Sequence, residues 1–163
     1  IRTKNSSESV SLADSKLKTK RFLSSRGIPF AETYRIIASQ QELKLFSLKS
    51  IEANEFVIKP NKGSGGRGIL IVKRAEDGYM IQDELWTDDE INLHMIDILH
   101  GSFSLYGSDK VVIEELLMPG EAFAPYCRHG LADIRIIVYN YVPVTAMIRM
   151  PTASSGGKAN LAQ

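Results

Sequence analysis

The sequence contains very little cysteine: Cys127 is the single one among 163 residues. An intrachain disulfide and a zinc site built on several cysteines are therefore excluded. Charge of one sign is not in excess either, because 20 lysines and arginines oppose 19 aspartates and glutamates, for a net charge of +1. Nucleic-acid-binding domains usually carry a clear basic excess, so this balance argues against a nucleic-acid partner.

Long hydrophobic runs are missing as well. The longest apolar segments, such as 111–113 and 136–139, span only a few residues, whereas a membrane-crossing helix needs about 20. No secretory signal pattern opens the printed sequence. We therefore expect a cytoplasmic protein without a membrane partner, and the sequence leaves its oligomeric state open.

The remaining composition is that of an ordinary soluble domain, with 44% hydrophobic and 24% charged residues. A chain of this length favours one domain with a sizeable core. The printed sequence begins at Ile1 and stops at Gln163, just after a glycine-containing turn-like stretch. We therefore expect a fragment of a longer chain.

The order of the expected elements indicates an α+β fold, with helices flanking largely antiparallel strands. Residues 1–11 are polar and rich in serine, which predicts a loosely held opening segment. Helices are expected at about 12–26, 39–49 and 87–100, and strands at 33–37, 56–60, 69–73, 79–82, 111–117, 133–140 and 142–150. The last two strands are separated by a residue or two near Asn140 and Tyr141, which predicts a hairpin.

A glycine-rich loop joins two β-rich segments within "FVIKPNKGSGGRG" (56–68). Its glycines would let backbone N–H groups approach an anion closely, while Lys59, Lys62 and Arg67 add positive charge. The loop lacks the Gly-Lys-Ser/Thr ending of a P-loop, and the next element is a strand, which a dinucleotide fingerprint does not allow. The pattern favours a phosphate-binding loop, with a flexible hairpin connection as the alternative.

Two adjacent carboxylates, Glu114 and Glu115, lie in an otherwise apolar strand. Side chains alternate between the two faces of a strand, so both cannot be hidden on one side. We expect one of them to face a cavity or a cationic partner. The alternative is a carboxylate that simply faces solvent.

A third group of charges lies on the expected hairpin. Asp133 and Arg135 share one face, and a turn centred near residues 140–141 would bring Arg149 close to Arg135. Two neighbouring arginines need an anion between them. Asp133 could supply it as a structural partner, and a bound phosphate or acyl phosphate is the functional alternative.

Taken together, these motifs resemble the ATP-grasp superfamily, and within it the RimK-like alpha-L-glutamate ligases and their relatives. The resemblance runs from about Leu12 to Gln163. It rests on the segments "DSKLKTKRFLSSRGIP", "FVIKPNKGSGGRGILIV", "VVIEELL", "FAPYCRHGLADIRIIVY" and "AMIRMPTASSGGKANLAQ".

The resemblance implies an ATP-grasp fold in which ATP lies between two small subdomains. Here they would cover about 12–110 and about 111–163, the second being truncated at its C-terminus. It also implies an ATP-dependent ligase that joins a small carboxylate to an amine through an acyl phosphate, with ATP and Mg²⁺ as cofactors. Cations and Mg²⁺ would stabilise the charge that develops on the phosphate oxygens.

Particular residues take roles from this resemblance. Lys16 and Lys59 match the lysines that contact the ATP phosphates. The lid over those phosphates corresponds to the loop with Lys62, Gly63, Ser64, Gly65, Gly66 and Gly68. The adenine-reading hinge corresponds to Glu115, Leu116 and Leu117, and Glu121 is a candidate for the ribose. Asp133, Arg135, Arg149 and Asn160 match positions at the phosphoryl-transfer site, with Arg135, Arg149 and Asn160 as catalytic candidates and Lys158 as a further ATP-binding residue.

One part of the family pattern is not found in the printed sequence. The magnesium ligands of the family, an acidic pair and an asparagine, are expected beyond Gln163, so we expect no metal ligand within this chain. A chain without them should be inactive as a ligase, although a longer parent could be competent.

Two other functions use the same ATP cradle. An ATP-grasp phosphotransferase would yield a phosphorylated acceptor instead of a new amide. A non-catalytic nucleotide-binding module would keep the cradle without chemistry.

Overall fold

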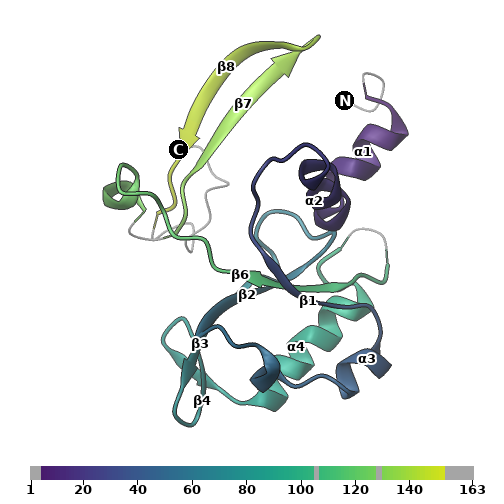
Figure 1. Ribbon diagram of the computed structural model, residues 1–163, viewed down its shortest axis with the longest axis vertical. Helices are drawn as coiled ribbons and strands as arrows, with labels where there is room; N and C mark the ends of the chain where they lie inside the picture. The colour runs from purple at the N-terminus through teal and green to yellow at the C-terminus, as the bar shows by residue number, and fades with distance from the viewer. Residues whose placement is uncertain (1–4, 105–106, 128–129, 153–163) are drawn as a thin grey trace. The chain divides into compact units, whose positions relative to one another are not determined.

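The structure is a computed structural model that describes residues 5–104, 107–127 and 130–152 (Figure 1). The chain divides into two compact units, Ile1–Leu116 and Leu117–Gln163. Each unit is described by itself below. No helix in the described ranges combines the length and the apolar character needed to cross a membrane.

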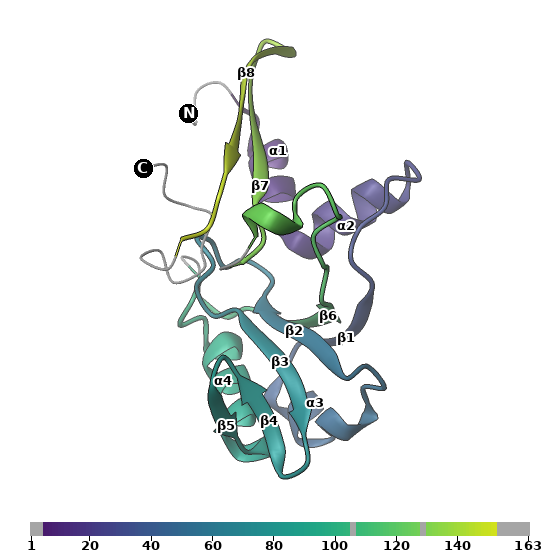
Figure 2. The same ribbon diagram turned by 90° about the vertical axis from the view of Figure 1, so that its left-hand side faces the viewer.

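The first unit contains a six-stranded sheet in which every neighbouring pair is antiparallel, in the order β1-β6-β2-β3-β4-β5 (Figure 2). Its strands are β1 (Thr33–Ile37), β2 (Glu55–Pro60), β3 (Leu70–Ala75), β4 (Gly78–Ile81), β5 (Glu84–Trp86) and β6 (Val111–Glu115). β6 therefore lies inside this sheet, between β1 and β2. The sequence had placed the start of a second subdomain near residue 111, but the pairing of β6 keeps it in the first unit.

Alternation along the strands gives the sheet one buried face. In β2, Phe56, Ile58 and Pro60 are buried, while Val57 and Lys59 point to the other side. Short turns follow: β3 and β4 are joined at residues 76–77, and β4 and β5 at residues 82–83. The sequence analysis missed β5, which is only three residues long.

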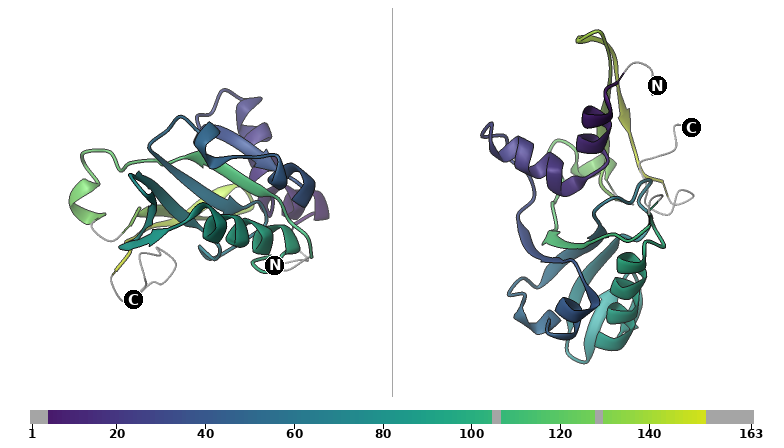
Figure 3. Two further views of the ribbon diagram at one scale, coloured as in Figure 1. Left: turned by 90° about the horizontal axis from the view of Figure 1, so that it is seen from below. Right: turned by 90° about the vertical axis from the view of Figure 1, so that its right-hand side faces the viewer.

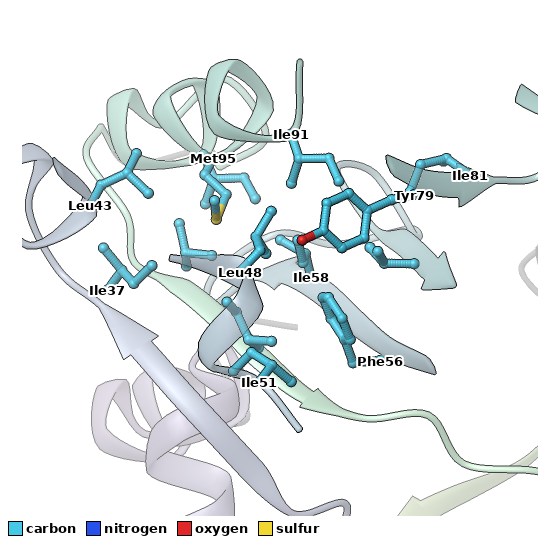
Figure 4. Packing of buried hydrophobic residues seen from close by; sticks show 14 of the residues in the cluster. Ile37, Leu43, Leu48, Ile51, Phe56, Ile58, Tyr79, Ile81, Ile91 and Met95 are labelled. Carbon is cyan, nitrogen blue, oxygen red and sulfur yellow. The ribbon is translucent and has the colours of Figure 1, made fainter. Parts of the chain in front are cut away.

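Helices α3 (Gln40–Lys44) and α4 (Asp88–His100) cover the buried face of the sheet, and side chains from the helices and the strands form one hydrophobic core. α4 begins with a capping box between Thr87 and Glu90 and ends at Gly101 in the left-handed conformation, as the sequence predicted. Its buried residues Ile91 and Met95 belong to the same hydrophobic cluster as Phe56 and Ile58 of β2 (Figure 4). Figure 3 (left) shows α4 lying across the strands.

The chain begins with two helices where the sequence predicted one. α1 covers Ser7–Ala13 and α2 covers Lys16–Ser24, because the side chains of Ser6 and Ser15 each cap the start of a helix. Part of the expected loose opening segment is therefore helical. Seen from the side (Figure 3, right), α1 and α2 lie on the opposite side of the sheet from α3 and α4.

The second unit contains a short 3₁₀ turn (Ala124–Tyr126) and the hairpin of β7 (Asp133–Tyr139) and β8 (Val142–Arg149). Its turn residues Asn140 and Tyr141 both have positive φ, which is typical of the tight turns that match the twist of a hairpin. The apolar side chains of the ribbon are largely exposed; Ile136 is 55% exposed and Val144 is 65% exposed. The hairpin predicted from the sequence is present, and none of its described residues belongs to a buried core.

Candidate functional site

The second face of the sheet, away from α4, carries the charged residues. Strand register places Glu114 of β6 beside Val57 of β2, which in turn pairs with Ile71 of β3. Lys59 lies two residues along from Val57 and so points to the same side. Ile71 is 54% exposed. The face therefore offers an apolar strip next to an ionic cluster.

Glu114 is the centre of that cluster. Its carboxylate is buried and forms ion pairs with the ammonium groups of Lys59 and Lys20, the Lys20 nitrogen lying 2.6 Å from Oε2. Lys20 comes from α2 and also donates to the carbonyl of Ala31 at 2.7 Å. The prediction that one of the two adjacent glutamates faces a cationic partner is confirmed, and that residue is Glu114.

Lys16 brings a further ammonium group to the same region. Its Nζ donates to the carbonyl of Gly63 at 2.7 Å, at the start of the glycine loop. Burial lowers the pKa of Lys16 from its ordinary value, and the neighbouring Lys59 lowers this pKa further, while Asp109 and Glu114 act in the opposite direction. A buried cation next to a second cation is destabilised, and an anion placed between them would relieve that cost.

Asn61 is a site residue that the sequence analysis missed. Its side-chain oxygen accepts hydrogen bonds from the Ser15 hydroxyl and the Leu17 amide, each at 3.0 Å. Its own carbonyl accepts from the Lys16 amide at 3.1 Å. Asn61 thus fixes the start of α2 against the start of the glycine loop. A polar residue directly after a buried strand is the only signal that could have indicated this.

The glycine loop is held at both ends. At Gly63 an added Cβ would lie 2.3 Å from the ring of Pro60, and at Gly68 it would lie 2.5 Å from the ring of Phe103. His94 also contacts the loop, with its Nε2 3.0 Å from the carbonyl of Gly68. Gly65 has a positive φ of 67°. The backbone path therefore requires glycine at several positions.

The remaining loop residues have local partners. The Lys62 amide donates to Oδ2 of the buried Asp109 at 2.8 Å, while the Lys62 side chain is exposed. The other oxygen of Asp109 is buried and has no hydrogen-bond partner among the residues described. Nε of Arg67 lies 3.4 Å from the carbonyl of Ser64. The loop is thus fastened through its backbone, and the exposed Lys62 ammonium makes one long contact, 3.5 Å, to the carbonyl of Ser108.

The expected hinge lies where the first unit ends. Glu115 closes β6, and its amide already donates to the carbonyl of Glu32 at 2.9 Å. Its carboxylate accepts from the Glu32 amide at 3.1 Å. Leu116 is the last residue of the first unit, Leu117 is the first of the second, and Glu121 is an exposed residue of the second.

On the hairpin, Arg149 lies diagonal to Arg135 and not directly opposite it. Arg149 pairs in register with Asp133 and forms a two-point ion pair with it, whereas Arg135 pairs with Met147. The register shifts by one residue between Ile137, which pairs with Thr145, and Val138, which pairs with Pro143, and this shift brings Arg149 opposite Asp133. Asp133 therefore acts as the structural partner of Arg149, which was the simpler of the two alternatives. Lys158 and Asn160 lie outside the described residues.

The structure thus brings together Lys16, Lys59 and the glycine loop in the first unit, and Asp133 with Arg149 in the second. Within the described ranges no group of three or more His, Cys, Asp or Glu residues is arranged to hold a metal ion. The described residues of the first unit carry the features of an anion site: converging lysines, a fixed glycine loop and an adjacent apolar strip.

Comparison with known protein families gives one match over residues 1–163, to the family described as "Sugar-transfer associated ATP-grasp". Searches of curated proteins and of solved structures found no match.

Proposed function

This chain belongs to the sugar-transfer associated ATP-grasp family, and on that premise we propose that its first unit binds the phosphates of ATP at Lys16, Lys59 and the glycine loop. ATP-grasp membership suggests an ATP-dependent, ligase-type enzyme. The antiparallel α+β architecture is consistent with such a domain.

One observation carries the proposal: the half-buried ammonium of Lys16 lies at the base of the glycine loop, and its charged form is disfavoured by partial burial and by Lys59. Glu114 and Asp109 supply part of the negative charge near this pair, and a polyphosphate would add the rest. Lys59 is already neutralised in part by Glu114. The carboxylate therefore holds the Lys59 side chain in place before the phosphate arrives.

The adenine ring is assigned to the apolar strip of Val57 and Ile71, and to the hinge residues Glu115, Leu116 and Leu117. Support comes from the exposed side chain of Ile71 on the same face as Lys59. The amide of Glu115 is bonded to Glu32. The hinge amides that read the adenine edge would accordingly be those of Leu116 and Leu117.

For the parent protein we propose carboxylate–amine ligation of the kind catalysed by RimK-like glutamate ligases. A carboxylate oxygen attacks the γ-phosphorus, which forms an acyl phosphate and releases ADP. An amine then attacks the acyl carbon, loses a proton and releases inorganic phosphate. Bound Mg²⁺ would neutralise phosphate charge, and the resemblance alone assigns Arg135, Arg149 and Asn160 to the transferring phosphoryl group.

Calorimetric titration with ATP, with and without Mg²⁺, tests the nucleotide site. Lys59→Ala should weaken binding at least about tenfold, because a charged contact to phosphate is worth roughly 1.5–3 kcal/mol. The matched control is Lys73→Ala, which removes an exposed lysine of the same sheet whose partner is Glu55. Equal affinities in the two variants would overturn the site.

A second variant guards against a folding defect in the first. Lys16→Met keeps a side chain of similar length and removes the charge at the base of the loop. It should also weaken ATP binding while the protein retains its circular dichroism spectrum. Once binding is established, assays of the longer parent separate the reaction classes: a new amide supports the ligase, and a phosphorylated acceptor would replace it with a phosphotransferase.

A further inference from the structure

The first unit contains a cavity of about 670 Å³ next to the lysine cluster, with a different lining. Its walls come from α1, from α2 and from the chain at Asn61, Lys62 and Lys110. The lining includes neither Lys16 nor Lys59, nor any glycine of the loop. Its volume is within the range usual for small-molecule sites.

α2 separates this cavity from the nucleotide side. Lys16 and Lys20 are four residues apart and lie on one side of the helix, where they reach Gly63 and Glu114. Leu17 and Arg21 are also four residues apart and line the cavity together with Lys18. One helix therefore presents two sets of cations in different directions.

The charges of the cavity are not balanced. Lys18, Arg21, Lys62 and Lys110 contribute to its lining, against the single carboxylate of Asp14. In the part of the chain that the structure describes, none of the four cations forms an ion pair. Lys18 donates to a neutral group, the hydroxyl of Ser11, at 2.5 Å.

The rest of the lining is suited to a ligand with hydroxyl groups. Ser7 and Ser11 of α1 offer hydroxyls, and Asn61 reaches the wall from the other side. Leu17 and Val10 add a small apolar surface that can contact the C–H groups of a ligand. Cations, hydroxyls and a small apolar surface together match a sugar that carries an acidic group.

We propose that this cavity binds an anionic sugar as a second ligand, with its phosphate or carboxylate group among Lys18, Arg21, Lys62 and Lys110. The affinity of the cavity for a sugar anion does not depend on the proposed ATP site. Asn61 and Lys62 connect the two sites, because Asn61 also bonds to the start of α2. The cavity thus lies beside the proposed phosphate site, with α2 between the two.

Titration of the 163-residue chain at constant ionic strength tests this assignment. The probes are glucose 1-phosphate, glucuronate and uncharged glucose, and Arg21→Gln is the principal variant. Arg21 is exposed and outside the buried core, so its replacement should leave folding intact. Lys44→Gln, which removes an exposed cation at the end of α3, is the matched control.

We expect saturable binding of at least one of the two anionic sugars and none of glucose. Arg21→Gln should weaken that binding about tenfold or more, Lys44→Gln should not, and ATP affinity should stay within twofold in both. The better of the two anions identifies phosphate or carboxylate as the recognised group.

Three results would overturn the inference: no binding of either anion, binding of glucose as tight as that of the anions, or equal loss in Arg21→Gln and Lys44→Gln. If ATP still binds in a Lys59-dependent manner, such a result removes only the sugar site. If the anionic sugars bind but ATP does not, the nucleotide proposal falls and the cavity keeps its anion specificity.

Discussion

Both units of the chain contain strands rich in apolar residues, but these residues are largely buried in the first unit and largely exposed in the second. In the first unit, β2 places Phe56 and Ile58 against α4, and both are fully buried. In the second, β7 carries a comparable apolar run, yet Ile136 is 55% exposed. Apolar strands are therefore no guide to a core by themselves. A core requires a second layer, and α3 and α4 provide it for the first unit.

The same contrast applies to the ion pairs. Glu114 is enclosed by two lysines that are themselves mostly buried. The Asp133 side chain is 42% exposed where it meets Arg149. Removing one partner of a buried ion pair leaves the other charge unpaired and poorly solvated, which is costly. At the surface, water solvates the remaining charge and the cost is small. The ion pairs of Glu114 should therefore contribute to the stability of the fold, whereas the Asp133–Arg149 pair should affect only the local geometry of the hairpin.

The largest effect is expected from Phe56→Ala. Truncating this fully buried ring should lower the free energy of unfolding by about 3–5 kcal/mol, because it leaves a cavity between β2 and α4. The companion change Ile136→Ala on the hairpin should alter it by less than about 0.5 kcal/mol. Trp86, the single tryptophan, lies in β5 and reports on the first unit in a denaturant titration. Equal destabilisation by both changes would erase the contrast.

Glu114→Gln should follow, with a loss of about 3 kcal/mol in the free energy of unfolding, because Lys59 and Lys20 lose their carboxylate. Asp133→Asn is the matched change in the second unit, and the denaturation midpoint of the first unit should not respond to it. Thermal melts followed by circular dichroism provide the measurement. If Glu114→Gln melts like the unaltered protein, the cluster is more hydrated than its burial indicates.

The smallest of the three effects is expected in the loop. Gly68→Ala should cost about 1–3 kcal/mol, since φ is +72° and the new Cβ would meet the Phe103 ring. It should also weaken ATP binding, because the loop must shift. Gly120→Ala in the second unit has open space around it and should change neither quantity. Calorimetry on both variants measures the ATP affinity. If Gly68→Ala changes neither stability nor affinity, the close packing of Gly68 against Phe103 is not required.

The sequence predicted those parts of the fold that depend on local signals. β1 matches its predicted bounds, and α4 begins and ends at the residues that its caps indicated. β5 was missed because three residues are too few to show a period. The division between α1 and α2 was missed because Ser15 can cap a helix or lie within one, and tertiary contacts to Asn61 decide between them.

Individual residues of the site could be predicted from the sequence, but the contacts between them could not. Lys59 and Glu114 each stood out in their own segments, yet they are 55 positions apart. They meet only because β6 pairs with β2, with Val57 opposite Glu114. Arg149 is a second case, since one extra residue in β8, Val144, changes the residue of β7 that Arg149 faces. Long-range register cannot be read from local periodicity, and the site depends on it.

The two anchors of the glycine loop bear on how fast a ligand can exchange. The backbone packs closely against Pro60 at Gly63 and against Phe103 at Gly68, so movement is expected mainly in the segment between them. Rotation about the backbone bonds of that segment breaks no strand hydrogen bond, because the segment lies between β2 and β3. Loop rotations of this kind take nanoseconds to microseconds, far less than the opening of a domain. Access to the lysines beneath the loop should therefore be limited by diffusion and desolvation.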